Sequence, residues 1–280
     1  PNQLLRNDGG TFVDVSYGAV AVPSGSLGAE WADYDNDGDP DVFVARYHEP
    51  DVLLRNNGGT FEDVTPEFMA YAGDSRGVAW ADYDNDGDMD VYVTTCSEGN
   101  LFYRNDGATF SNVSVYPLNY SHYSLGASWG DYDNDADVDL YVSCWGHYGI
   151  LCRNDGEDWF RDVSRDPIDD IGYTITSTWS DIDSDGDLDL YNADQYGRNR
   201  LFWNGFDWPH HWLEIELDGS ASNRMGIGAR VRVVTGSVSQ IRDIGAGCAL
   251  GAQNPAAAHF GLAGAAAVDS LIVRWPKVIE

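Results

Sequence analysis

The chain alternates short apolar runs with polar turns over most of its length, and no run keeps a helical period for long. Apolar segments such as 42–44 and 91–93 have the length and composition of β-strands. Asn-Asp-Gly or Asn-Asn-Gly tripeptides follow several of the runs, and these sequences favour tight hairpin turns. The pattern predicts an all-β fold.

The strand pattern repeats with a period of about 49 residues. Four Trp-led acidic segments mark the units, at 31–41, 80–90, 129–139 and 179–189. Their first aspartates, at 33, 82, 131 and 181, are spaced by 49, 49 and 50 residues. A second marker keeps the same phase, reading LLRNDGGTF at 4–12, LLRNNGGTF at 53–61, FYRNDGATF at 102–110 and LCRNDG at 151–156, with a weaker copy at 201–205.

Each unit has room for four short strands. The first ends at the Trp, the second follows the acidic loop, the third carries the Arg-Asn marker, and the fourth is the Thr-Phe run after the turn. Four strands in a repeat of roughly 40–50 residues are typical of a β-propeller blade. We expect the repeated Trp and Phe side chains to pack between blades.

Composition and charge then point to a cation. The chain has 46 acidic against 16 basic residues and a formal net charge of −30. That sign argues against nucleic acid or an anionic membrane as a partner, because both are bound mainly through basic patches. A hydrophobic content of 43% and ten Trp argue against disorder. No apolar run is long enough for a transmembrane helix.

Each acidic segment places aspartates at positions one, three, five, seven and nine of a loop. The twenty candidate metal ligands are Asp33, Asp35, Asp37, Asp39 and Asp41 in loop one; Asp82, Asp84, Asp86, Asp88 and Asp90 in loop two; Asp131, Asp133, Asp135, Asp137 and Asp139 in loop three; and Asp181, Asp183, Asp185, Asp187 and Asp189 in loop four.

Five carboxylates so close together repel one another, and a hard divalent cation reverses that effect. Calcium takes six to eight oxygen ligands, whereas magnesium demands a tight octahedron and gives up its waters reluctantly. Glycine at position six permits a sharp turn with positive φ. Position twelve is Val44, Val93, Val142 or Asn192 rather than the Glu of an EF-hand. Four copies in phase argue against merely solvated acidic loops.

These repeats resemble the FG-GAP/VCBS-type calcium-binding blades of integrin α-chain heads and many bacterial surface proteins. The resemblance implies about four calcium ions, one per loop. It also implies ligation by side chains at positions one, three, five and nine, and by the backbone carbonyl at position seven. Loop three departs from the pattern with Ala136 at the turn glycine, and loop four with Ile182 and Ser184. We expect loop three to bind most weakly.

A different pattern follows the repeats. Alternating runs at 212–217, 229–234, 239–244 and 270–275 predict further strands. The motifs SNR at 222–224, GIGARV at 226–231, HFGL at 259–262 and VRWP at 273–276 closely resemble the ASPIC/UnbV domain, which follows such propellers in cartilage acidic protein and bacterial secreted proteins. We therefore expect propeller repeats over 1–208 and a small β-domain over 209–280.

No catalytic constellation stands out. Nucleophile-elbow, zinc-protease, P-loop and dinucleotide motifs are absent, and His210, His211 and His259 are interpreted as structural. We expect a secreted or cell-surface calcium-binding protein, not an enzyme, with a role in adhesion, structure or self-assembly and a protein, glycan or second copy as partner. The alternative is an extracellular enzyme or enzyme accessory that uses the propeller face as a substrate site.

The sequence leaves two pairs of structural alternatives. The four cysteines are at 96, 144, 152 and 248. Cys144 and Cys152 flank a predicted hairpin and could form a disulfide, or the thiols could be buried and free. Residues 1–15 supply only the outer half of a blade. That half-blade either pairs with the fourth repeat, or further sequence or a neighbouring subunit completes the ring. We favour the second alternative, which includes a filament.

Overall fold

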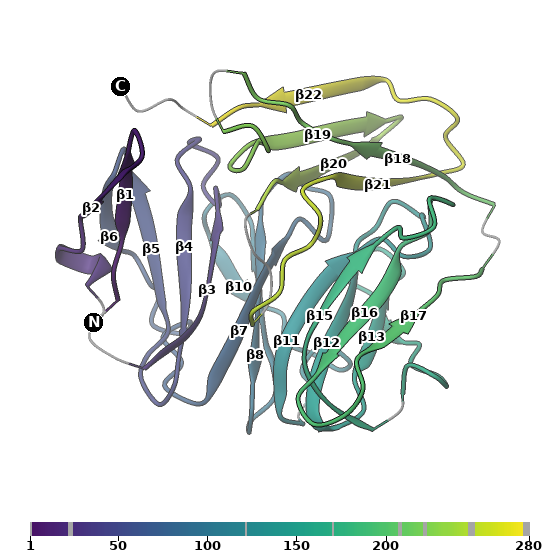
Figure 1. The fold of residues 1–280 in the computed structure, drawn as a ribbon, viewed down its shortest axis with the longest axis horizontal. Coiled ribbons are helices and arrows are strands. Elements are labelled where there is room, and N and C mark those ends of the chain that lie inside the picture. Colours follow the sequence, from purple (N-terminus) through teal and green to yellow (C-terminus); the bar gives the residue numbers. More distant parts are fainter. Residues whose placement is uncertain are drawn as a thin grey trace.

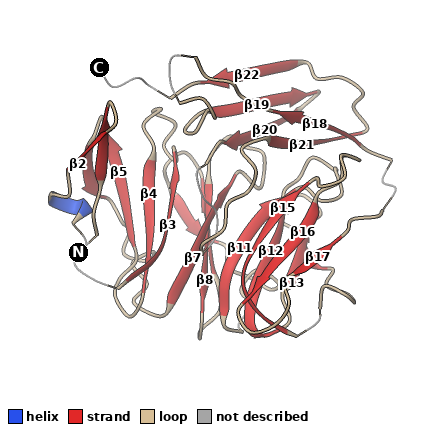
Figure 2. Cartoon of the chain, viewed as in Figure 1, coloured by secondary structure: helices blue, strands red, loops and turns tan. Residues whose placement is uncertain are grey.

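The computed structural model describes residues 2–21, 25–120, 122–169, 171–206, 209–220, 223–245 and 250–276. Within these ranges the regular structure consists of β-strands and one 3-10 turn, Gly18–Val20 (Figures 1 and 2). Successive antiparallel sheets form blades that stand side by side, and a smaller β-unit lies across one end of them. The all-β prediction is confirmed.

Three blades are complete four-stranded meanders. The first contains β3 (Ser26–Ala32), β4 (Asp41–Arg46), β5 (Val52–Asn57) and β6 (Thr60–Asp63); the second contains β7 (Ser75–Ala81), β8 (Asp90–Thr95), β9 (Leu101–Asn105) and β10 (Phe110–Asn112); the third contains β11 (Ser124–Gly130), β12 (Asp139–His147), β13 (Ile150–Asn154) and β14 (Phe160–Asp162). The predicted order of strands within each repeat is therefore confirmed.

Two partial blades flank the complete ones. The fourth repeat forms β15 (Gly172–Ser180), β16 (Asp189–Asp194) and β17 (Arg200–Phe202), and β15 also pairs with the end of β12. At the other end, β1 (Leu5–Asp8) and β2 (Thr11–Asp14) form a hairpin that pairs with no other described strand. The alternative in which this half-blade pairs with the fourth repeat is therefore wrong, and the described strands do not close into a ring.

The repeated Trp side chains join one blade to the next. Trp80, Trp129 and Trp179 are at most 9% exposed. Each indole Nε1 donates a hydrogen bond to a backbone carbonyl on the inner strand of the preceding blade, at 3.1–3.4 Å. Trp31 is 45% exposed, because only the half-blade precedes it. The predicted packing of Trp between blades holds for each Trp that a complete blade precedes.

The cysteines of the blades are free. Cys96, Cys144 and Cys152 are buried thiols, so the disulfide alternative for Cys144 and Cys152 is wrong. Burial raises the pKa of Cys144 to about 12, which keeps that thiol protonated and unreactive. Cys248 lies outside the described residues.

The C-terminal unit contains two small sheets. β18 (His211–Ile215) pairs with β21 (Ala258–Ala263), and β19 (Arg230–Thr235) lies between β20 (Val238–Asp243) and β22 (Ser270–Arg274). The four predicted strands occur with slightly shifted ends, whereas β21 was not predicted. The boundary expected between 208 and 209 falls beside residues 207–208, which lie outside the described ranges, as does Ser222 of the SNR motif.

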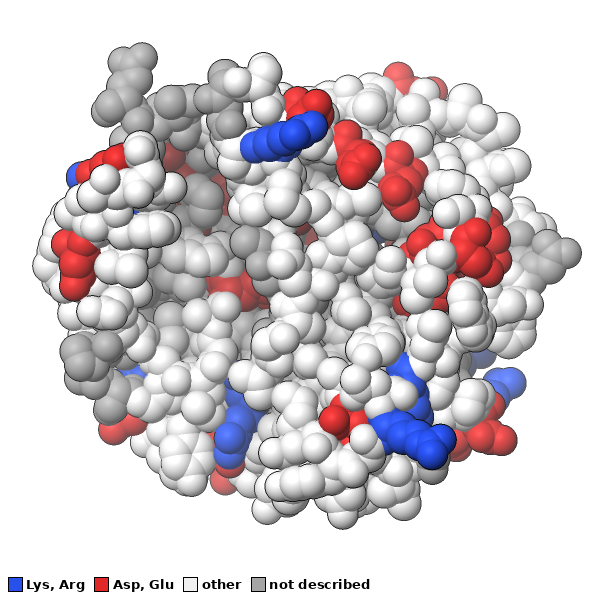
Figure 3. All heavy atoms as spheres, viewed as in Figure 1, with Lys and Arg blue, Asp and Glu red and all other residues white. Residues whose placement is uncertain are grey.

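Acidic side chains reach the surface in several separate places on the face drawn in Figure 3, in keeping with the net charge of −30. Among the described residues, no helix is long and apolar enough to cross a membrane.

Candidate metal centres

The four acidic loops connect the first and second strands of their blades, and each turns through two left-handed residues. At position six, φ is 90° for Gly38, 95° for Gly87, 84° for Ala136 and 97° for Gly186. At position four, φ lies between 58° and 62° for Asn36, Asn85, Asn134 and Ser184. The turn at position six was predicted from the sequence. The one at position four was missed, although Asn is among the few residues that tolerate this conformation.

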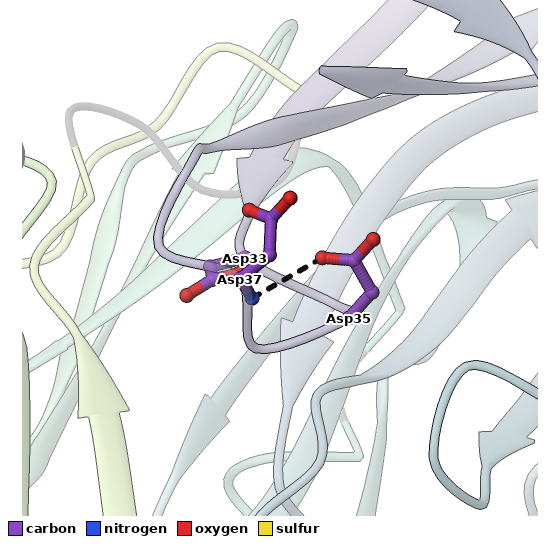
Figure 4. A group of neighbouring side chains, drawn as sticks. All are labelled: Asp33, Asp35 and Asp37. Atoms are coloured by element: carbon purple, nitrogen blue, oxygen red, sulfur yellow. Dashed lines mark hydrogen bonds between the residues drawn. The ribbon is translucent and has the colours of Figure 1, made fainter. Parts of the chain in front are cut away.

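Each loop brings three carboxylates together, with one oxygen of each within 4.8 Å of the others. The clusters are Asp33, Asp35 and Asp37; Asp82, Asp84 and Asp86; Asp131, Asp133 and Asp139; and Asp181, Asp183 and Asp189. Figure 4 shows the first cluster, in which the backbone N–H of Asp37 donates to Asp35 Oδ1 at 3.3 Å. Twelve of the twenty predicted ligands thus occur in these groups. The others are at positions seven, at positions nine of loops one and two, and at positions five of loops three and four.

The carboxylates also stabilise the curled conformation of their own loop through hydrogen bonds. In loop one, Gly38 N–H donates to Asp33 at 3.1 Å, and Asp39 N–H donates to Asp37 Oδ1 at 2.8 Å. The same two contacts recur in loops two, three and four. Local backbone donors therefore fix the direction of the side chains at positions one and five.

Position nine clamps the loop to the third strand of its blade. Asp41 is fully buried; its Oδ1 accepts from Asn56 N–H at 2.7 Å and its Oδ2 from Tyr34 N–H at 3.2 Å. Loops two, three and four repeat both contacts. The Asn of the second sequence marker, which was interpreted as a turn residue, is therefore the partner of this aspartate. In loops three and four the same carboxylate also belongs to the metal cluster.

Position seven links one loop to the next. The Nδ2 of Asn36 donates to Asp88 Oδ1 at 2.5 Å, and Asn85 and Asn134 make the same contact with Asp137 and Asp187 at 2.7 Å. The side chains of these aspartates thus bind neighbouring loops. That arrangement is compatible with ligation through the carbonyl, the role that the resemblance implies for position seven.

Burial makes the loop carboxylates costly to ionise. It is the largest cause that raises the pKa of Asp41 and Asp82 to about 7 and of Asp84 and Asp133 to about 6, and neighbouring carboxylates raise these pKa values further. The pKa of Asp131 is also raised well above its ordinary value, chiefly by burial. A bound cation would favour the ionised forms.

Two carboxylate oxygens in the clusters also indicate that a cation would bind there. Asp82 Oδ1 and Asp133 Oδ1 are buried and have no hydrogen-bond partner, a costly state for a carboxylate oxygen. An ion at the centre of the cluster would supply the missing partner. The clusters contain only carboxylates, and oxygen donors of this kind suit a hard cation such as calcium. The residues present therefore fit the ion.

Loop three allows a test of whether the turn at position six needs glycine, because it has an alanine there. Ala136 adopts φ of 84°, a conformation that costs a residue with a Cβ about 1 kcal/mol relative to glycine. We expect Ala136→Gly to tighten calcium binding at loop three by about fivefold, measured by a site-resolved calcium titration.

The matched control is the reverse change in loop two. Gly87 has φ of 95°, and no atom lies within 4 Å of the Cβ that an alanine would add. Gly87→Ala therefore introduces the backbone cost without a clash and should weaken loop two by a similar factor. Affinities that are equal at both loops before and after the changes would show that the turn needs no glycine.

Comparison with known proteins gives a consistent picture. The family model described as FG-GAP-like repeat matches residues 1–44, 33–93 and 89–142, and the model described as ASPIC and UnbV matches residues 219–279. The first three acidic loops lie within the matched repeats, and the fourth lies beyond them. A search of curated proteins by sequence found no match.

One solved structure with some likeness is that of a mutant Photorhabdus luminescens Tc holotoxin pore. It is 15% identical, with a TM-score of 0.37, over 82% of this chain and 12% of that chain. A likeness at this level carries no argument about fold or function.

Proposed function

Because the chain belongs to the FG-GAP-like repeat family and ends in an ASPIC and UnbV domain, we propose that it is a secreted or cell-surface calcium-binding propeller with a role in adhesion, structure or self-assembly. The observation that carries the proposal is the recurrence of a cluster of three carboxylates in the acidic loop of each of the four repeats. The buried, unpartnered oxygens of Asp82 and Asp133 support it.

In this proposal the carboxylates of the four clusters hold the ions, and the hydrogen bonds from the loop backbone orient them. Bound calcium supplies positive charge that offsets the repulsion between neighbouring carboxylates. Calcium-binding modules outside cells bind the ion at about 0.1–1 mM, which suits loops that are partly open to solvent. With four ions bound the formal charge would be −22, so the surface stays acidic.

Exposed aromatic side chains support a role in binding a protein, a glycan or a second copy. Trp145 packs against Tyr173 and Tyr196 with ring centroids 5.4 Å and 6.5 Å apart. Tyr173 is 41% exposed and Tyr196 is 70% exposed. Clusters of this kind are typical of interaction surfaces, since aromatic side chains contribute much of the contact energy there.

Calcium stoichiometry tests the proposal directly. We expect the full chain, dialysed against calcium, to retain about four ions per molecule by elemental analysis. Asp82→Asn should lower that number by one, because the cluster of loop two then loses a carboxylate, whereas the exposed Asp218→Asn should leave it unchanged. Less than one ion per molecule at millimolar calcium would contradict the proposal.

The second candidate is an extracellular enzyme or enzyme accessory. A cavity of about 550 Å³ lies between the inner strands of the blades and the C-terminal unit, and Glu30, Trp80, Trp129 and Asn254 contribute to its lining. Burial raises the pKa of Glu30 well above its ordinary value, as a general acid requires. Turnover in a broad hydrolase and oxidoreductase screen that Glu30→Gln abolishes would favour this candidate.

A further inference from the structure

The C-terminal unit contacts the acidic loops directly, through a surface that we call the cap face: Arg230, Arg242, Arg274, His210, His259 and the backbone at 261–263. Figure 1 shows the strands of this unit lying across one end of the blades. The residues of the cap face contact the loops, so the cap face meets the candidate metal centres. Elsewhere the unit contacts the blade strands, since Asn254 Oδ1 accepts from Thr178 Oγ1 at 2.8 Å and from Trp179 N–H at 3.2 Å.

Loop one is held by two arginines. Arg230 is 8% exposed; its Nη2 donates to the backbone carbonyl of Asp33 at 2.8 Å, and its Nη1 donates to Asn36 Oδ1. Asp243 fixes this guanidinium in place through two hydrogen bonds of 2.6 Å and 2.9 Å. Arg274 Nη1 donates to the carbonyl of Asn36 at 3.3 Å and lies 3.6 Å from Asp33 Oδ2.

Loop three is held through its backbone carbonyls. Ala263 N–H donates to the carbonyl of Asn134 at 2.9 Å, and His210 Nδ1 lies 2.7 Å from the carbonyl of Asp133. A Cβ at Gly261 would lie only 2.6 Å from the backbone of Asn134, so glycine is needed for this close approach. The cap face therefore fits loop three closely.

Loops two and four complete the surface. His259 Nε2 lies 3.0 Å from the carbonyl of Gly186 in loop four, and its ring stacks on Trp212. Arg242 lies over the ring of Phe260, and its positive charge acts to lower the pKa of Asp82 in loop two and of Asp131 in loop three. The interpretation of His210 and His259 as structural residues agrees with these contacts.

We propose that the C-terminal unit is a calcium-dependent cap. Calcium binding to the loops strengthens the docking of the cap, and the docked cap in turn raises the calcium affinity of the loops. The inference rests on the proposed calcium binding. Most acceptors of the cap face are backbone carbonyls of the loops, so docking depends on how each loop is curled. Without an ion, repulsion between the carboxylates opens the curl and moves these carbonyls.

The positive charges of the cap face oppose this preference for loaded loops, but they do not prevent docking on a loaded loop. Five aspartates and one calcium ion leave a loop with a formal charge of −3, so a loaded loop still attracts an arginine. Linkage is reciprocal, and a cap that prefers loaded loops must raise their calcium affinity by the same factor. A purely electrostatic effect of the cap would lower the calcium affinity of the loops, because a nearby guanidinium repels the ion.

The experiment compares Arg230→Met with Arg232→Met in the full chain. Arg232 lies on the same strand, but its Nε donates to Ser239 Oγ and it is exposed. We expect Arg230→Met to weaken calcium binding at loop one by about fivefold or more, and Arg232→Met to have no effect. Tighter binding in Arg230→Met would overturn the proposal.

A second measurement uses the unaltered protein and does not depend on how the variants fold. Hydrogen exchange at the Ala263 amide, which donates to loop three, should accelerate at least tenfold when EDTA replaces calcium. Equal exchange in both conditions, with about four ions bound per molecule, would overturn the cap and leave the proposed function standing. If elemental analysis finds no bound calcium, the proposed function itself fails, and the cap fails with it.

Discussion

EDTA is expected to lower the midpoint of thermal unfolding (Tm) of the calcium-loaded protein by tens of degrees. An ion that binds only the folded state adds about 2.7 kcal/mol per site at a hundredfold excess over Kd, or about 11 kcal/mol for four such sites. That sum is comparable with the whole free energy of unfolding of an ordinary domain, about 5–15 kcal/mol. At about 2–4 °C per kcal/mol for a chain of this size, the shift is large enough for calorimetry to resolve clearly.

The control separates specific binding from screening of the net charge of −30. Magnesium and sodium salts at matched ionic strength screen the same repulsion and should restore only a small part of the Tm. Asp82→Asn should reduce the gain from calcium, whereas Asp218→Asn, at an exposed site outside the loops, should preserve it. A Tm that EDTA leaves unchanged would refute calcium as a structural ion.

The blades could be predicted from the sequence because their determinants are local. Turn tripeptides and alternating apolar runs act over a few residues, and their recurrence every 49 or 50 residues marks the blades. The aspartates of each loop are close in sequence, and twelve of them lie in the clusters. The contact between Asn56 and Asp41 could not be predicted in this way. The N–H of Asn56 binds Asp41, fifteen residues away, and that partner is set by strand pairing rather than by neighbouring residues.

The contacts between blades and with the C-terminal unit depend on tertiary packing. Asn36 reaches the next loop, fifty-two residues on, and Arg230 reaches Asp33 across almost two hundred residues. Strand β21 was missed because Ala and Gly dilute its alternation, while its pairing with β18 supplies the structure. The separate half-blade β1–β2 likewise depends on which strands are present to pair with it.

The metal-free protein is expected to become more stable as the pH falls from 7.5 to 5. Asp41 and Asp82 have folded-state pKa values of about 7, raised from an ordinary value of 3.8 chiefly by burial. The folded state therefore binds more protons than the unfolded state over this window. The resulting stability is fully present below the ordinary pKa and is lost as the pH rises through the folded pKa. Each extra proton changes the free energy of unfolding by about 1.4 kcal/mol per pH unit.

Calcium should reverse the slope, because the ion binds the ionised carboxylates and acid displaces it. Urea unfolding at pH 5, 6 and 7.5, in EDTA and in calcium, should give two curves that converge as the pH falls. Asp82→Asn is the matched variant: Oδ1 of the carboxylate has no partner, while Oδ2 accepts from Gly87 N–H at 3.2 Å. The amide can keep the second contact, so the variant should stabilise the metal-free protein at pH 7.5, flatten its pH dependence and destabilise the loaded protein. A metal-free protein whose stability rises with pH would show that these carboxylates are ionised without an ion, and the argument from their burial would fall.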